Sequence, residues 1–440
     1  MTAAVLGQRT AAKAERRPKI AFFDYPDVFE DFYSHYGVDQ HTFATRWADT
    51  GSHALVKLIQ REIGDVVWEA FSLAPTLTAA QHEVTGCTVR FWRSPVAHRL
   101  LWRAFYTPRC AWRWARLYPF YAPIASYLSI LSWRFVYTLL RDRPDVILLQ
   151  DYATGQFDVL VLLAKLLGIP TVAVHTGSQP GHYKGKLAKH WSIRNLDCIV
   201  VSNRDEYEML AVRYRVARER LKLILTPIDT DVFRPLDRAA ACRALGLDPA
   251  KRYALYVGRF DDGVKRISAI VRAFGAAAKR HADIELLIVG DGPAGDRRIV
   301  ETAIGQHAPG RVRLLGWTSD KDHLARIYNV AECLVLASRR EGFPTVVGEA
   351  LACGVPVLAS RVGGVPELVA HGETGWLFAP GDDAALTALL GHVFDDPAAA
   401  HALKPAARRM AEQHVAPEVI AAGFRQCFAA ILPRHAPTSA

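Results

Sequence analysis

Short apolar runs alternate with helix-period stretches along most of this 440-residue chain. An apolar run of four to six residues followed by a helix-period stretch is typical of β-α-β units with parallel strands. One unit is predicted in the first half, where strands at 143–149 and 169–174 flank a helix at 157–167. The alternation returns in the second half as further strand-like runs at 253–257, 284–289, 311–315, 334–337 and 355–359. The pattern therefore predicts an α/β fold with parallel sheets.

Chain length and a change of composition predict two domains. A chain of this length exceeds one typical hydrophobic core. The stretch 226–235 contains two prolines and is typical of an interdomain linker. We predict, in order, a tail, a first domain, a linker, a second domain and a final helical segment, at 1–17, 18–225, 226–238, 239–415 and 416–440.

Charge and cysteine content narrow the possible partners and compartment. The net charge of +10 suits nucleic acid, membrane phosphates or a phosphorylated substrate, and the absence of a nucleic-acid motif favours the last two. Seven cysteines without a C-x-x-C pair indicate reduced thiols. Residues 1–17 lack the apolar core of a signal peptide. We expect a cytoplasmic protein.

Two stretches of the second half have the chemistry of an anion site. At 334–359 a strand, a loop, a helix and a second strand follow one another, with Glu341 on the loop and Glu349 about one turn into the helix. Loops at strand ends and open amides at helix starts are usual ligand sites in such folds. After the strand at 253–257 come Gly258, Arg259 and Lys265, and two cations beside a helix start suit a diphosphate.

The longer string containing these carboxylates resembles the family-4 glycosyltransferases. It reads E-G-F-P-x4-E-A-x-A-x-G-x-P-V from Glu341, followed by G-G-x-x-E-x-V and G-x-x-G-x-L. The resemblance implies the GT-B architecture, in which two Rossmann-like doubly wound domains face each other across a cleft, and a last helix that returns to the first domain. It also implies that Glu341 faces the donor sugar and Glu349 the ribose. The backbone expected to line the sugar and diphosphate is that of Gly342, Phe343, Pro344 and Thr345.

Four further residues match the family. Arg259 and Lys265 fit its G-R-x5-K pattern, although Arg266 stands where glycine usually follows, and they would neutralise the departing diphosphate. His175, after the strand at 169–174, resembles the histidine that contacts the donor from the first domain. Trp317 would lie near the nucleotide base. The resemblance extends from about residue 145 to the C-terminus, and the family's Gly-Gly loop after the first strand is missing.

Two motifs point elsewhere and are disfavoured. Gly290–Gly295 reads G-x-G-x-x-G, but the acidic residue that a dinucleotide site needs about 20 positions later is absent. The string resembles the family's G-D-G-P turn better. Asp229 and Asp231 form a D-x-D that could bind a divalent metal, yet they lie in a string similar to the family linker. We expect a capping or hinge role for Asp229, and neither a metal nor another cofactor.

Two regions of the first half keep alternative interpretations. Residues 25–51, rich in aromatics and carboxylates, form either a surface insertion or an acceptor-binding lid. Residues 84–141 contain no acidic residue. Their basic and aromatic residues suit an anionic membrane interface, a buried helix or a phosphorylated acceptor. Those residues are Arg90, Trp92, Arg93, Arg99, Trp102, Arg103, Phe105, Tyr106, Arg109, Trp112, Arg113, Trp114 and Arg116. The apolar stretch 118–133 is too short to span a bilayer and predicts a buried helix.

The resemblance implies a retaining glycosyltransferase that moves a sugar from a nucleoside diphosphate sugar to an acceptor hydroxyl, with Glu341, His175, Arg259 and Lys265 as catalytic residues. Retention would proceed by same-face attack with the donor phosphate as base. The alternatives are a nucleotide-sugar epimerase or hydrolase on the same fold, or a non-catalytic protein that binds nucleotide sugar or membrane.

Overall fold

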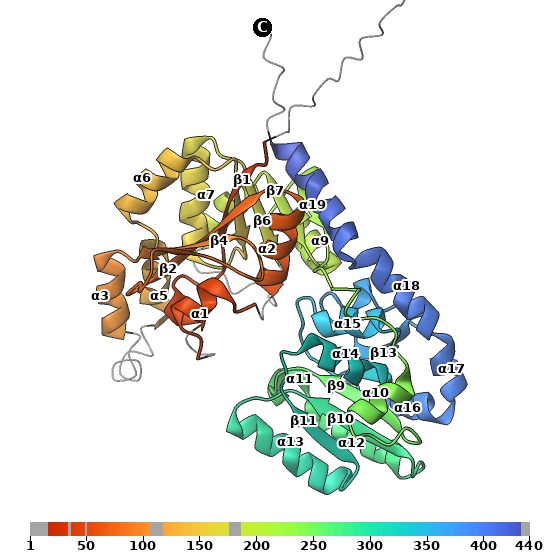
Figure 1. Ribbon diagram of the computed structural model, residues 1–440. Helices are drawn as coiled ribbons and strands as arrows, with labels where there is room; N and C mark the ends of the chain where they lie inside the picture. Colours follow the sequence, from red (N-terminus) through yellow and green to blue (C-terminus); the bar gives the residue numbers. More distant parts are fainter. Residues whose placement is uncertain (1–15, 34–36, 49–50, 106–117, 176–185, 433–440) are drawn as a thin grey trace, which may run out of the picture.

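The chain folds into two lobes, each built on a mostly parallel sheet (Figure 1). The computed structural model describes residues 16–33, 37–48, 51–105, 118–175 and 186–432. The N-terminal lobe has strand order β3-β4-β2-β1-β5-β6-β7-β8, in which β3 is antiparallel to β4 and the other described strand pairs are parallel. Its strands are β1 Lys19–Phe23, β2 Asp65–Ser72, β3 Ala79–Gln81, β4 Thr88–Arg93, β5 Val146–Gln150, β6 Thr171–His175, β7 Cys198–Val201 and β8 Leu221–Leu223.

The C-terminal lobe has strand order β11-β10-β9-β12-β13-β14, and every pairing is parallel. Its strands are β9 Arg252–Val257, β10 Ile284–Val289, β11 Val312–Gly316, β12 Ala331–Leu336, β13 Val357–Ser360 and β14 Gly375–Phe378. In each sheet the strand order reverses beside the first strand, between β1 and β5 and between β9 and β12. Ligands of doubly wound sheets bind at the carboxyl ends of strands at such a switch point.

Helices cover both faces of the N-terminal sheet. On one face α2 packs beside an aromatic cluster, and on the other α6, α7, α8 and α9 bury their apolar sides. The helices of this lobe are η1 Phe29–Asp31, α1 Gln40–Thr45, α2 Gly51–Glu62, α3 Val96–Phe105, α5 Tyr118–Leu128, α6 Trp133–Asp142, α7 Gly155–Leu167, α8 Lys186–Arg194, α9 Arg204–Val212 and η4 Arg218–Arg220.

In the C-terminal lobe α12 packs against α13 and α16, while α15 packs against α14 and α18. The helices after the linker are α10 Arg238–Ala244, α11 Asp262–Lys265, α12 Ile267–Ala278, α13 Ala294–His307, α14 Lys321–Asn329, α15 Thr345–Ala352, η5 Val365–Glu367, α16 Asp383–Asp395, α17 Pro397–Ala402, α18 Lys404–His414 and α19 Pro417–Ile431. None of the helices in the described part of the chain is long and apolar enough to cross a bilayer.

The last helix belongs to the N-terminal lobe, as Figure 1 shows for α19 beside α2. Arg425 of α19 forms an ion pair with Glu62 of α2 at 3.1 Å. Cys427 of α19 forms a disulfide with Cys198 of β7, 229 positions earlier. The prediction that the thiols are reduced is therefore wrong for this pair. The spacing argument considered only neighbouring cysteines, whereas the fold brings distant ones together.

The linker between the lobes lies under the C-terminal helices. Arg408 of α18 donates to the carbonyl oxygens of Thr230 and Phe233 in the linker and of Ala352 at the end of α15. Asp229 accepts a hydrogen bond from the Val232 amide at 3.2 Å, which confirms its capping role. The linker is thus fixed to α15, the helix that contains Glu349.

The lid interpretation of residues 25–51 is wrong for three of their aromatic residues. Phe29, Tyr33 and Phe43 are buried and pack on one another and on Trp68 of β2. Aromatic rings that fill a core cannot present their faces to a sugar. These three residues extend the hydrophobic core, whereas Tyr25, Phe32 and Trp47 are half-buried.

The buried helix predicted at 118–133 is also partly wrong. Helix α5 ends at Leu128, and α6 begins at Trp133. Ile124 and Trp133 are exposed, because the apolar residues of this stretch exceed what one helix face can bury. These exposed apolar side chains form part of the outer surface of the N-terminal lobe.

Candidate functional site

The switch point of the C-terminal sheet brings together two of the predicted site residues. Lys265 follows β9 and Glu341 follows β12, the two strands on either side of the reversal. The Lys265 Nζ atom donates to both carboxylate oxygens of Glu341, at 2.7 and 2.8 Å. Ser338 Oγ donates to the same carboxylate at 2.6 Å. Glu341, with 8% of its side chain exposed, is therefore held in one orientation.

Backbone packing behind Glu341 requires glycine. A Cβ atom on Gly363 would lie 2.1 Å from the Glu341 carbonyl oxygen, and its φ of +50° also favours glycine. The Gly364 amide donates to the Gly342 carbonyl oxygen at 2.7 Å. The G-G-x-x-E string thus supports the loop that presents Glu341.

The G-x-G-x-x-G string has a similar structural role. A Cβ atom on Gly290 would lie 1.9 Å from the carbonyl oxygen of Gly258, and the Phe260 amide donates to the Asp291 carbonyl oxygen at 2.8 Å. The glycines let the loops after β9 and β10 touch along their backbones. They therefore shape the loop that carries Arg259 and Lys265.

Helix α15 begins beside Glu341 with an open first turn. Pro344 occupies the N-cap position and provides no side-chain cap. Uncapped amides at a helix start attract anions. Glu349, further along α15, accepts a hydrogen bond from Tyr328 Oη at 2.7 Å. Burial raises the pKa of Glu349, and the Tyr328 hydrogen bond opposes that rise.

The remaining predicted residues of the C-terminal lobe are more open. Arg259 is exposed and lies 3.8 Å from Asp261. Trp317 follows β11 and is 62% exposed. Arg266, in the place of the family's glycine, adopts a left-handed backbone with φ of +55° and pairs with Asp383 at 2.6 Å. The backbone conformation is therefore one that favours glycine, even though the side chain differs.

His175 lies in the N-terminal lobe, at the carboxyl end of β6. It is buried, its ring stacks on Tyr152 with 4.4 Å between centroids, and its Nε2 atom lies 3.6 Å from Asp151. Its Nδ1 atom is in direct contact with Glu206 of α9. Burial lowers the pKa of His175 and raises that of Glu206 well above its usual range.

A short path of contacts joins His175 to the Glu341 loop. Ser202 donates to the His175 carbonyl oxygen at 3.5 Å, and the Ser202 carbonyl oxygen lies 3.0 Å from where a Cβ atom of Gly364 would stand. Next to it, the Arg204 amide donates to Glu367 at 2.9 Å. The described residues place His175 and Glu341 on opposite lobes, with the loop before α9 touching the loop behind Glu341.

Sequence reasoning missed several carboxylates at the carboxyl edge of the N-terminal sheet. Asp24 follows β1 and accepts hydrogen bonds from Tyr33, Ser52 and the Tyr25 amide. Burial raises the pKa of Asp24 to about 6, and the charge of Asp151 adds to the rise. Asp24 lies where the family has its Gly-Gly loop, so only a comparison with the family's spacing could have drawn attention to it.

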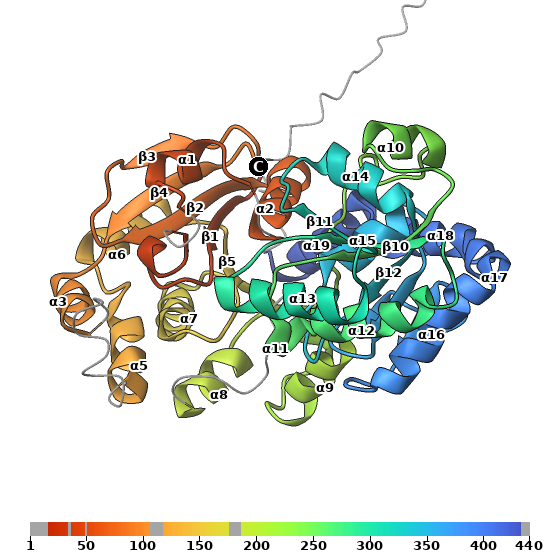
Figure 2. The same ribbon diagram turned by 90° about the horizontal axis from the view of Figure 1, so that it is seen from below.

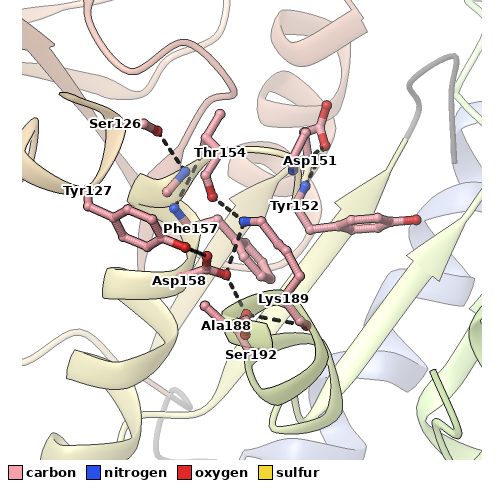
Figure 3. A network of polar contacts seen from close by, with 12 residues as sticks. Ser126, Tyr127, Asp151, Tyr152, Thr154, Phe157, Asp158, Ala188, Lys189 and Ser192 are labelled. Atoms are coloured by element: carbon pink, nitrogen blue, oxygen red, sulfur yellow. Dashed lines mark hydrogen bonds and ion pairs between the residues drawn. The ribbon is translucent and has the colours of Figure 1, made fainter. Parts of the chain in front are cut away.

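A buried network holds α7 and α8 near this edge (Figure 3). Asp158 accepts hydrogen bonds from Lys189 at 3.0 Å and from Tyr127 at 2.7 Å, and Ser192 also donates to it. Burial lowers the pKa of Lys189, while Asp158 opposes that effect. Lys189 is fully buried, and its pairing with Asp158 fixes the two helices against each other.

The basic segment at 84–141 is divided by the structure. Arg90 pairs with Asp142 at 3.0 Å, and Trp92 and Trp102 donate to Glu69 and Asp31. These residues are part of the folded interior. Residues 106–117, which include Tyr106, Arg109, Trp112, Arg113, Trp114 and Arg116, lie outside the described residues.

Two facing Rossmann-like lobes with a returning last helix define the GT-B fold. Solved structures agree with the whole arrangement. A sucrose-phosphate synthase from Thermosynechococcus elongatus matches with a TM-score of 0.68 and 23% identity, over 94% of this chain and all of the other. Anabaena HepE in complex with UDP matches with a TM-score of 0.68 and 14% identity, over 93% of this chain and 99% of the other.

Sequence comparisons give the family. Residues 69–232 match the model described as Glycosyltransferase Family 4, and residues 251–396 match the model described as Glycosyl transferases group 1. The chain belongs to the family-4 glycosyltransferases.

Its curated relatives match over part of their length. A D-inositol 3-phosphate glycosyltransferase of Mycolicibacterium gilvum is 31% identical over 229 residues, which cover 52% of this chain and 51% of the relative. An N-acetyl-alpha-D-glucosaminyl L-malate synthase of Bacillus anthracis is 35% identical over 155 residues, 35% of this chain and 39% of the relative. The chain thus spans about half or less of the length of these relatives.

Proposed function

We propose that the protein is a retaining glycosyltransferase that transfers a sugar from a nucleoside diphosphate sugar to an acceptor hydroxyl. The observation that carries the proposal is the Lys265–Glu341 pair at the switch point, beside the uncapped start of α15. A preorganised cation and carboxylate at this place suit a donor that separates into an anionic diphosphate and a cationic sugar. The names of the relatives, which include a UDP complex and several sugar transferases, support the same donor class.

Each residue has a stated role in this proposal. Lys265 and Arg259 neutralise the departing diphosphate, with the open amides at the start of α15 (Thr345 and its neighbours) as further donors. Glu341 stabilises the positive charge that develops on the sugar, and Glu349 accepts hydrogen bonds from the ribose. His175 holds the sugar from the N-terminal lobe. Retention, with the donor phosphate as base, follows the family resemblance.

The test is a thermal-shift panel of UDP, GDP, ADP and TDP. A nucleotide present at a hundred times its dissociation constant should add about 2.7 kcal/mol to the free energy of unfolding. Lys265→Ala should reduce the shift, while Lys279→Ala, at the end of α12, provides a cationic control. A protein that responds to none of the four nucleotides is not a transferase of this kind.

Product analysis separates the transferase from its alternatives. The nucleotide that binds is supplied as its sugar conjugate, with and without candidate acceptors, and the product is examined by NMR. Transfer requires acceptor and gives a new glycoside with the donor's anomeric configuration. Turnover without acceptor identifies an epimerase or hydrolase instead, and binding without turnover identifies a non-catalytic protein.

We also propose that the N-terminal lobe docks on an anionic membrane surface through α3 and α6. On α6, Trp133, Tyr137 and Leu140 recur on one outward face and are 74%, 60% and 53% exposed. Arg134 stacks on Trp133, with its guanidinium 5.5 Å from the ring centroid. Helix α6 already buries Phe135 and Leu139 on its inner side, so its outer face is a second apolar face.

Helix α3 repeats this arrangement on the same flank of the lobe, away from the C-terminal lobe (Figures 1 and 2). Val96 and Leu100, four positions apart, are 61% and 60% exposed, and Arg103 is exposed beside them. Aromatic and aliphatic residues with arginine suit a lipid interface, where each cation contributes about 1 kcal/mol. Because anionic lipid is abundant in the cytoplasmic leaflet, the proposal includes a location at the cytoplasmic face of the membrane.

Vesicle co-sedimentation tests the docking surface. Binding should increase with anionic lipid and decrease with salt. The double variant Trp133→Ser/Tyr137→Ser should release the protein, whereas Val212→Ser, an equally exposed apolar residue on α9, should not. Binding that is independent of lipid charge and is retained by the double variant contradicts the proposal. So does a double variant that still binds vesicles but no longer self-associates.

A further inference from the structure

Glu206 is a buried carboxyl group to which neither the motifs nor the family assigns a role. It lies in the first turn of α9 and is 2% exposed. The Asn203 side chain caps this helix by accepting a hydrogen bond from the Glu206 amide at 2.8 Å. The cap fixes the start of α9, and it therefore holds the Glu206 side chain against His175.

The contact between Glu206 and His175 needs a proton. The Oε1 atom of Glu206 and the Nδ1 atom of His175 are in direct contact, and neither of these buried atoms has another hydrogen-bond partner among the described residues. Because buried polar atoms need a hydrogen-bond partner, a hydrogen shared between the two satisfies both. With the proton on Glu206, Nδ1 accepts, and the neutral imidazole must carry its own hydrogen on Nε2. If both ring nitrogens are protonated and Glu206 is a carboxylate, Nε2 again carries a hydrogen. A neutral ring with its hydrogen on Nδ1 and a charged Glu206 is the only other arrangement.

The surroundings decide against that last arrangement. It leaves a net negative charge in a buried site, and burial raises the pKa of Glu206 well above its usual range, with the charge of Asp151 as a further cause. Asp151 also lies 3.6 Å from Nε2, where an acceptor favours a hydrogen on that nitrogen. Tyr152 stacks on the ring and limits its rotation.

We propose that Glu206 is a positioning residue that, through Nδ1 of His175, keeps a hydrogen on Nε2 and so makes the imidazole a hydrogen-bond donor to a hydroxyl group of the donor sugar. The inference rests on the proposed transferase function for the identity of the acceptor of that hydrogen bond. The pairing of Glu206 with His175 itself does not depend on it. Glu206 would act through His175 and not on the substrate.

Other charged groups near the Glu206–His175 pair can influence its protonation through their electrostatic interaction with Asp151. Among the described residues these are Lys189 of α8 and Asp24 at the end of β1, which interact electrostatically with Asp151. Figure 3 shows Asp151 and Tyr152 at the end of their strand, close to Lys189. A pH effect assigned to Glu206 must therefore persist when Asp24 is replaced by asparagine.

Three variants of the full-length protein test the role. Glu206→Ala removes the partner of Nδ1, and we expect single-turnover rates to decrease by roughly 10- to 100-fold, the loss that follows removal of the hydrogen-bond partner of a metal-bound imidazole. Glu206→Gln can still donate to Nδ1, so it should retain most of the activity. Asp205→Ala, an exposed neighbour in the same helical turn, should behave as the wild type.

The pH profile separates positioning from simple support of the fold. Wild-type turnover should decrease as the pH rises through the raised pKa of Glu206, because its deprotonation moves the hydrogen of His175 to Nδ1. Glu206→Gln cannot lose this proton, so its profile should be flat over that range. Nucleotide binding, which takes place in the C-terminal lobe, should be unchanged in both variants, and the same thermal-shift assay shows that they are folded.

An observation that needs no activity tests the pair directly. In 15N spectra of labelled protein, with the His175 signals identified by their loss in His175→Gln, Nε2 should appear protonated in the wild type and should lose this preference in Glu206→Ala. A wild-type ring that carries its hydrogen on Nδ1 alone overturns the inference, as does an Ala variant with wild-type turnover. If the spectra agree and no sugar transfer is found, the transferase proposal fails while the pairing stands.

Discussion

The two lobes use their carboxyl groups in opposite ways. In the C-terminal lobe Glu341 is charge-paired with Lys265 at a switch point, and the uncapped start of α15 lies beside it. In the N-terminal lobe Asp24, Glu69 and Glu206 are held by the interior, where burial raises their pKa values. We propose that the Lys265–Glu341 pair of the C-terminal lobe meets a ligand, whereas Asp24, Glu69 and Glu206 keep protons in the interior of the N-terminal lobe.

Replacing Glu341 should give the largest effect in the C-terminal lobe. Positive charge develops on the sugar only as its bond to the diphosphate breaks, so a Glu341 that faces the sugar, as proposed, would stabilise the transition state more than the bound donor. Glu341→Gln should lower the single-turnover rate by at least about 100-fold while leaving nucleoside diphosphate binding nearly intact. Rapid-quench kinetics and calorimetry measure the two quantities. Normal turnover in this variant would remove Glu341 from the chemistry.

Glu349 should show the converse behaviour. If it holds the ribose equally in the bound donor and in the transition state, Glu349→Gln should weaken donor and free nucleotide alike. A lost hydrogen bond to a charged group costs roughly 1.5–3 kcal/mol, which is about 10- to 150-fold in affinity. Calorimetric titration of the free nucleotide measures the loss. If Glu341→Gln and Glu349→Gln weaken nucleotide binding equally, the two carboxylates do not have separate roles.

For the N-terminal lobe, the prediction concerns how the stability of the fold, and not the activity, depends on pH. It uses the buried carboxyl group of Glu69. Burial raises its pKa to about 7, while the nearby charge of Arg90 and the hydrogen bond from Trp92 oppose the rise. The folded state therefore binds this proton more tightly than the unfolded state. The resulting stability is fully present below about pH 4.5 and is lost as the pH rises through about 7, a change of about 3 kcal/mol at most.

The measurement is the melting temperature between pH 5 and 8. Glu69→Gln keeps an acceptor for Trp92 but cannot ionise, so the wild type should lose more stability than the variant over this range. Asp65→Asn, an exposed position on the same strand, is the control. Parallel curves for wild type and Glu69→Gln would show that Glu69 does not titrate with folding.

The smallest expected effect is that of a chelator. If Lys265 and Arg259 neutralise the departing diphosphate as proposed, no metal ion is needed there, so we expect turnover to be the same with and without EDTA. Added manganese should not increase it. A loss of activity in EDTA that manganese restores would return Asp229 and Asp231 to consideration as ligands.

The two lobes also differ in how much of their structure could be predicted from the sequence. The strands and helix around Glu341 were predicted within a few residues, because each motif there is continuous and each glycine has a local cause. The N-terminal contacts join distant positions: His175 meets Glu206 31 residues later, and Cys198 meets Cys427 on the last helix. The sequence of residues 25–51 did not distinguish an acceptor lid from a surface insertion. The burial of Phe29, Tyr33 and Phe43, with Phe43 packed on Trp68, excludes a lid role for these three rings.

The return of α19 gives the molecule the topology of an inserted domain. The chain enters the C-terminal lobe through the linker and leaves it through α18, after which α19 rejoins β7 and α2. A recombinant exchange of donor specificity therefore needs two crossover points, one in the linker and one between α18 and α19. A chimera made with a single crossover would instead set a foreign α19 on the native sheet, and would have to repack that surface before it could fold.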